Sequence, residues 1–146
     1  MATGTVVGTG GRAKLARVDW LKTGLKAALL SVAAVLLVQV VALTLRPELV
    51  QFQPLDSYPR TVVFTAIPAL AATAVFAGLA KRGGDPIARF LAIASIVLLL
   101  SFIPDFALPL AGKTLPGSIV AAGMHAVAGI VTVATIVFSY RKQVGR

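Results

Sequence analysis

The chain has 146 residues, of which 58% are hydrophobic and 13% charged, with a formal net charge of +9 and no cysteine. A water-soluble domain carries about 25% charged residues, so this composition excludes an ordinary soluble domain and predicts an integral membrane protein. The lack of cysteine excludes disulfides and thiolate metal sites.

The N-terminal residues 1–19 are small, polar and basic, and we expect a flexible segment there. Residues 12–26 mix basic side chains with apolar ones at helical spacing. That pattern fits an interfacial helix or, equally well, an ordinary charged flank of the first span. A signal peptide is the competing interpretation, but the apolar core is long and no clear A-x-A site follows it.

Four apolar segments follow, and each is bounded by basic residues. A helix needs about 20 residues to cross the hydrocarbon core, and lipid demands that backbone hydrogen bonds be made within the segment. We place the spans at about 25–45, 61–80, 87–108 and 117–140. Their short connections predict an all-α protein, an antiparallel four-helix transmembrane bundle with up-down-up-down order, in one domain over 20–140. A basic tail, 141–146, follows.

The positive charges predict the orientation of this bundle. Eleven of the 14 lysines and arginines fall at the ends that the two termini share, and an excess of basic residues marks the cytoplasmic side. We therefore expect a protein of the cell membrane with both termini in the cytoplasm, in contact with anionic lipids at that face and without a nucleic-acid partner. Trp20 and Tyr140 are expected at the inner interface, where amphipathic rings anchor helices.

Polar side chains inside the spans are rare. At about 1.5 Å per residue, Gln39, Asp105, His125 and the helix-kinking Pro68 all lie about 8–12 Å below the outer boundary of the membrane. This shared level predicts a polar layer in the outer half of the bundle, with Asp105 facing His125 from the next antiparallel helix. Ser101 is a further candidate for this layer, since it lies one turn before Asp105.

The position of Asp105 allows a second interpretation. Pro104 would kink the third helix, or it would end that span, and Asp105 would then lie among the lipid headgroups. The charge of His125 is open as well, because a neighbouring carboxylate favours the imidazolium ion and burial favours the neutral ring. For His125 and Gln39, a single hydrogen bond to a neighbouring helix is the simpler expectation.

No set of residues resembles a catalytic or metal centre. One histidine without cysteine supplies neither a zinc site nor bis-histidine haem ligation within one chain. We therefore expect no metal, no cofactor and no enzymatic activity.

Two short motifs carry a resemblance to a known family. "SFIPDFAL" at 101–108 and "GMHAVAG" at 123–129 resemble a family of small bacterial membrane proteins with four helices, catalogued as a domain of unknown function. The resemblance covers about Trp20 to Tyr140. It implies the four-helix architecture and no mechanism, and it draws attention to Pro104, Met124 and His125.

Two functions of different classes remain open. The first is a structural or accessory bundle that binds lipid or a membrane partner, with a homo-oligomer as one form of partner. The second is a small proton-coupled transporter or carrier in which Asp105 and His125 titrate. The sparse ionisable groups favour the first, and the shared level of the polar residues favours the second.

Overall fold

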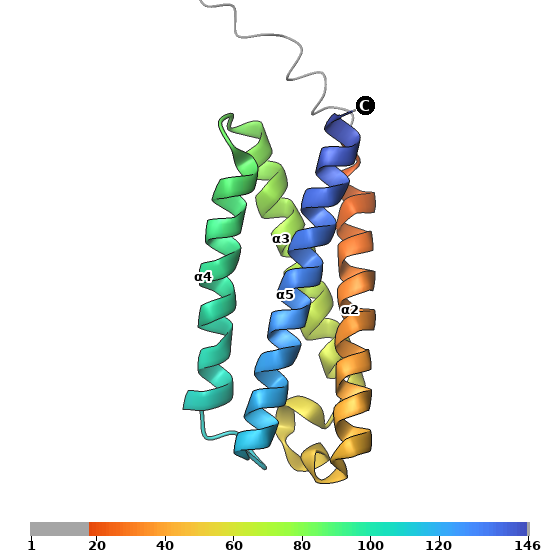
Figure 1. The fold of residues 1–146 in the computed structure, drawn as a ribbon, viewed down its shortest axis with the longest axis vertical. Helices are drawn as coiled ribbons and strands as arrows, with labels where there is room; N and C mark the ends of the chain where they lie inside the picture. Colours follow the sequence, from red (N-terminus) through yellow and green to blue (C-terminus); the bar gives the residue numbers. More distant parts are fainter. Residues whose placement is uncertain (1–17, 146) are drawn as a thin grey trace, which may run out of the picture.

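The computed structural model describes residues 18–145, and these residues form four long helices joined by short connections (Figure 1). The helices are α2 (Trp20–Leu45), α3 (Tyr58–Lys81), α4 (Pro86–Ala107) and α5 (Leu115–Val144). Two short 3₁₀ helices, η1 (Pro47–Gln51) and η2 (Gln53–Leu55), lie between α2 and α3. Each of the four long helices is long and apolar enough to cross a bilayer.

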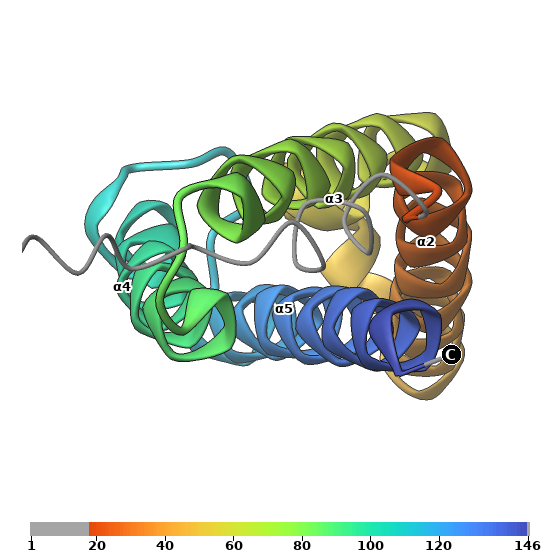
Figure 2. The same ribbon diagram turned by 90° about the horizontal axis from the view of Figure 1, so that it is seen from above.

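The four helices stand side by side, and each connection joins neighbouring helix ends (Figure 1). We call the end with the start of α2, the 82–85 turn and the end of α5 the terminal end. The opposite end, with residues 46–57 and 108–114, is the loop end. Seen from above, α2 lies beside α3 and α5, and α4 lies beside α3 and α5 on the far side (Figure 2). Helix α4 is the least covered: only Phe90 and Asp105, near its two ends, are buried.

Local sequence signals explain where each helix begins. Each N-cap residue has a side-chain oxygen that accepts a hydrogen bond from the first turn, and such oxygens satisfy backbone N–H groups that have no partner within the helix. Three of the helices also have a proline in their first turn, where its missing N–H costs nothing. The N-cap residues are Asp19, Ser57, Asp85 and Thr114.

The loop end is packed by its own connections. Leu49, Phe52 and Leu55 are buried against α2 and α5, in one core with Val35 and Met124. The backbone N–H of Gln53 donates to the carbonyl of Ala111, at 3.0 Å, which ties the two connections of this end together. The loop between α2 and α3 is therefore an ordered segment that packs on the loop end of α2 and α5.

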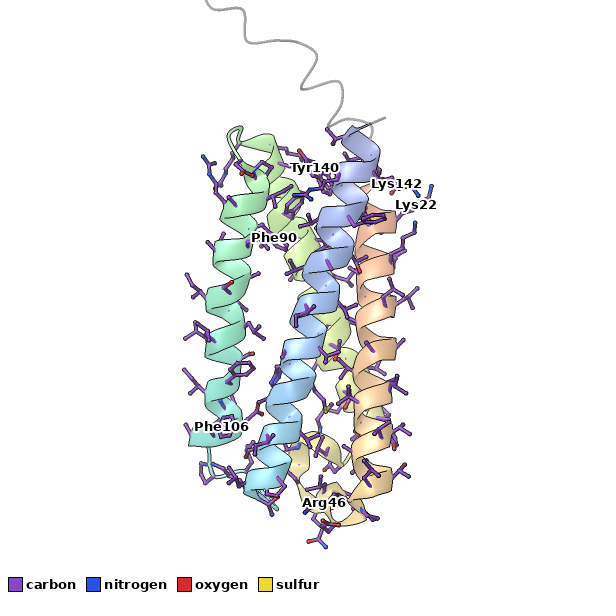
Figure 3. All side chains as sticks on the ribbon, in the orientation of Figure 1. Lys22, Arg46, Phe90, Phe106, Tyr140 and Lys142 are labelled. Atoms are coloured by element: carbon purple, nitrogen blue, oxygen red, sulfur yellow. The ribbon has the colours of Figure 1, made fainter. Side chains whose placement is uncertain are left out.

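The terminal end is held by aromatic side chains. Phe76 of α3 packs edge-on against Phe90 of α4 and Tyr140 of α5, with 5.0 Å between ring centroids in each pair. Trp20 of α2 stacks on Tyr140 at 6.2 Å. This cluster joins all four helices at one level, which is near Tyr140 and Phe90 in Figure 3. Trp20 and Tyr140, expected as interface anchors, thus also contact each other.

Helices α2, α3 and α5 are longer than the spans expected from the apolar runs, because their capped ends reach past the apolar cores, whereas α4 is shifted from its expected span by one residue. Residues 20–26 are the first two turns of α2, and the helical part of the expected tail belongs to α5. The expected flexible segment falls mostly on residues 1–17, which lie outside the described residues. Pro104 does not end the third helix, since α4 continues through it to Ala107, and where the span leaves the bilayer stays a prediction. Helix α3 likewise continues through Pro68, where the bend stays a prediction.

Candidate functional site

The candidate site is a side-chain pair between α4 and α5. Nδ1 of His125 lies 2.9 Å from Oδ2 of Asp105, so the contact expected between these consecutive helices is present. Asp105 is only 2% exposed, whereas 44% of the His125 side chain is exposed. The carboxylate is thus enclosed by the bundle and the imidazole is its partner. An Asp105 that faces away from His125 is contradicted by this contact, whereas its level relative to the lipid headgroups stays a prediction.

Ser118 supports the pair from the first turns of α5. Its hydroxyl donates to the backbone carbonyl of Asp105 at 2.6 Å, and the residue is 1% exposed. The last carbonyl groups of a helix have no hydrogen-bond donor within the helix. The hydroxyl of Ser118 supplies a donor for the carbonyl of Asp105 and thereby fixes the position of this residue. Sequence reasoning missed this role. The available signal was the seven-residue spacing that places Ser118 and His125 on one face of α5.

Lys113 fixes the same end of α4 from outside the bundle. Its ammonium group donates to the carbonyl of Phe106 at 2.6 Å and to that of Leu108 at 3.0 Å. A cation at the C-terminal end of a helix is favourable, because the unpaired carbonyl groups there carry partial negative charge. The turn of α4 that contains Asp105 is thus held by Ser118 on one side and Lys113 on the other.

The chemistry of the pair follows from its hydrogen-bonding capacities. An ionised carboxylate only accepts hydrogen bonds, so Nδ1 of His125 carries a hydrogen when Asp105 is ionised. Nε2 is then the atom that can accept a proton or a hydrogen bond. The arrangement can therefore orient an imidazole and bind one proton. Among residues 18–145, no group of three potential metal ligands is present.

Gln39 is completely buried at the neighbouring face of α2, but its partner is not the pair. Its Nε2 donates to the backbone carbonyl of Leu55 at 3.1 Å, and its Oε1 has no hydrogen-bond partner among residues 18–145. The side chain thus fastens the η2 segment to α2. The expected interhelical bond is replaced by a bond to the connection that covers the loop end.

Ser101 does not extend the pair through a hydrogen bond of its own. Its hydroxyl donates to the carbonyl of Leu98, in the preceding turn of α4, at 2.7 Å. The expected polar layer is therefore one pair, Asp105 and His125, with Ser118 beneath it and Gln39 bonded elsewhere.

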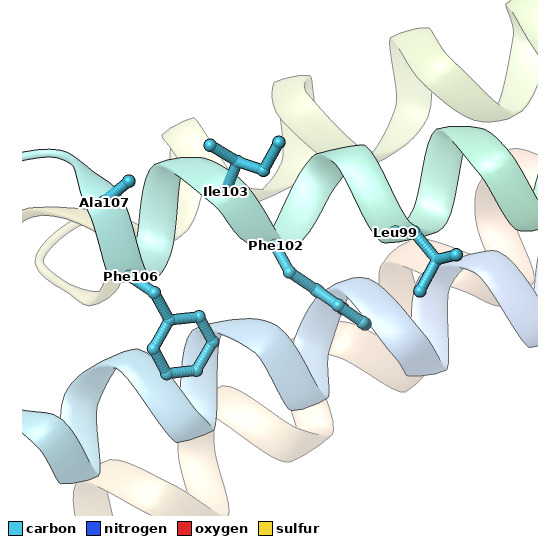
Figure 4. A pocket seen from close by; sticks show the side chains of 5 residues that line it. All are labelled: Leu99, Phe102, Ile103, Phe106 and Ala107. Atoms are coloured by element: carbon cyan, nitrogen blue, oxygen red, sulfur yellow. The ribbon is translucent and has the colours of Figure 1, made fainter.

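The outer flank of α4 next to this site is apolar. A shallow, open depression there is lined by Leu99, Phe102, Ile103, Phe106 and Ala107. The rings of Phe102 and Phe106 extend toward α5 (Figure 4). All five residues are apolar and belong to one helix, so this surface fits hydrocarbon chains.

Comparison with known proteins places this architecture in a family. The model of a family of unknown function, DUF6069, matches residues 11–142. The chain belongs to this family. The match includes Asp105 and His125, and it confirms the resemblance to a family of unknown function. No curated protein matches the chain, and no solved structure matches it.

Proposed function

We propose that this member of DUF6069 is an integral protein of the cell membrane that crosses the bilayer four times, as an antiparallel bundle with both termini in the cytoplasm. Two observations support this. Each long helix can span a bilayer, and seven of the ten lysines and arginines among residues 18–145 lie at the terminal end. In this orientation the terminal end faces the cytoplasm and the Asp105–His125 pair lies toward the opposite side.

Within the membrane the protein acts as a structural or accessory bundle that binds lipid or a membrane partner, including a second copy, and the proposal assigns it no reaction. The observation that carries this is the use of polar side chains inside the spans, which bond to the chain itself. Ser31 of α2 bonds Thr132 of α5 at 2.7 Å, Ser118 bonds the backbone of α4, and Gln39 bonds the η2 segment. Such bonds hold helices together in lipid.

The test is ion flux in liposomes that contain the purified protein. With an imposed pH gradient, the structural role predicts proton leakage equal to that of protein-free liposomes. Leakage well above that level would contradict it.

A second candidate, a proton-coupled carrier, is favoured by one observation. The imidazole of His125 lies half-exposed at the surface of the bundle while its carboxylate partner is buried, so the ring is the member of the pair that a proton donor from outside the bundle would meet. This candidate predicts a flux that is lost in His125→Leu and retained in Ser31→Ala, a variant that removes a buried polar group from a different helix pair. Equal flux in both variants would rule out His125 as the proton-binding group.

A further inference from the structure

The acidic side chains of this chain are almost completely engaged. Glu48 pairs with Arg46, Asp56 with Arg60, and Asp105 with His125. Asp85 caps α4, and its Oδ1 accepts hydrogen bonds from two backbone N–H groups. Asp19 caps α2 and also contacts the ammonium group of Lys22 at 3.0 Å. The backbone N–H of Lys22 is the main cause that lowers the pKa of Asp19, so this carboxylate stays ionised at neutral pH.

The basic residues at the two ends of the bundle differ in how many of them have a bonding partner within the protein. At the loop end all three are bonded: Arg46 and Arg60 to carboxylates, and Lys113 to backbone carbonyls. At the terminal end, the described residues offer acidic partners at Asp19 and Asp85 alone, and the sequence of residues 1–17 contains no acidic side chain. The exposed cations at this end are Lys22, Lys26, Lys81, Arg82, Arg89, Arg141 and Lys142. The two carboxylates at this end, of which Asp19 is paired with Lys22, cannot neutralise seven cations, so most of the counterions come from outside the protein.

Four of these cations belong to the two helix ends that Gln143 joins, the start of α2 and the end of α5, and we call them the α2–α5 basic cluster: Lys22, Lys26, Arg141 and Lys142. The two helix ends are fastened together by Gln143. Its Oε1 accepts from the backbone N–H of Asp19 at 2.7 Å, and its Nε2 donates to Thr23 at 3.2 Å. Lys22 and Lys142 lie at this end, near Tyr140 (Figure 3).

The neighbouring aromatic rings set the depth of this cluster. The half-buried Trp20 and Tyr140 stack directly beside it. Tryptophan and tyrosine favour the headgroup level of a bilayer, and lysine side chains extend from there toward the phosphates. Anionic lipids attract basic residues at this level, whereas a nucleic acid would have to approach within the headgroup layer.

We propose that the α2–α5 basic cluster binds the phosphate group of an anionic phospholipid in the cytoplasmic leaflet. This rests on the proposed membrane location. The cluster is chosen over the 82–85 turn because two helices fixed to each other supply its cations.

The test uses Trp20, the single tryptophan of the chain, which lies next to the cluster. The protein is reconstituted with brominated lipids, which quench tryptophan on contact. Brominated phosphatidylglycerol is compared with brominated phosphatidylcholine. We expect the anionic lipid to associate with Trp20 several-fold more strongly, and the ratio to fall to about one in Lys26→Gln/Lys142→Gln. The control Lys81→Gln/Arg82→Gln removes the same charge from the other side of this end and leaves the ratio unchanged.

Each other outcome counts against the proposal in a distinct way. A ratio near one in the unmodified protein, or an equal fall in both double variants, overturns the lipid site while the membrane location stands. No quenching by either brominated lipid overturns the membrane location itself. A change in Trp20 fluorescence on adding an oligonucleotide to phosphatidylcholine vesicles, without preference for the anionic lipid, assigns the cluster to nucleic acid instead.

Discussion

At the scale of single residues, the buried carboxylate of Asp105 is the group on which the candidate site is built. Its meeting with His125 could be predicted from the sequence, because helical rise and a short connection fix the relative height of two consecutive helices. The partner of Gln39 could not be predicted, since it is a backbone carbonyl in an irregular segment. Side-chain periodicity contains no information about such a carbonyl.

The Asp105–His125 pair predicts non-additive effects on stability. His125→Leu leaves a carboxylate that is 2% exposed without its imidazole partner, which should lower the free energy of unfolding by about 1–3 kcal/mol. The double variant Asp105→Leu/His125→Leu removes the buried charge as well and should be more stable than His125→Leu alone. Unfolding in mixed detergent measures both variants. A double variant that is less stable than His125→Leu would show that the pair is not coupled in this way.

At the scale of the elements, the connections of the loop end determine how tightly the bundle closes. The α4–α5 connection reaches the α2–α3 loop through Gly112, which has φ +67°. A β-carbon at this position would collide with the carbonyl of Gln51. Glycine is therefore required at position 112 for two reasons. Its backbone conformation is left-handed, and the backbone of the α2–α3 loop passes too close to leave room for a side chain. The sequence indicated a short connection between the third and fourth spans, but the contact of Gly112 with Gln51 depends on the folded structure.

Gly112→Ala should therefore destabilise the protein, by about 1–3 kcal/mol for the backbone conformation alone and by more through the collision. Gly123→Ala is the matched control, because a β-carbon there meets nothing within 4 Å and α5 gains helical propensity. Thermal unfolding in detergent should show a lower midpoint for Gly112→Ala and an unchanged or higher one for Gly123→Ala. Equal midpoints for the two variants would contradict the close packing of the loop end.

At the scale of the whole molecule, hydropathy and basic flanks were enough to predict four helices, since each apolar run matches the thickness of a bilayer. The peripheral place of α4 could not be predicted. Its residues are apolar on all sides, so no amphipathic stripe indicates which face packs inward. Its two buried residues are buried by contacts with other helices: Phe90 packs against Phe76 of α3, and Asp105 contacts His125 of α5.

The central claim is that the terminal end faces the cytoplasm, and labelling of single cysteines tests it most directly. The chain has no cysteine of its own, so Gln51→Cys at the loop end and Arg82→Cys at the terminal end each introduce one exposed thiol. In intact cells, a membrane-impermeant thiol reagent should modify the cysteine at 51 and leave the one at 82 unmodified until the cells are lysed. Modification of the cysteine at 82 in intact cells, with protection of the one at 51, would contradict the account.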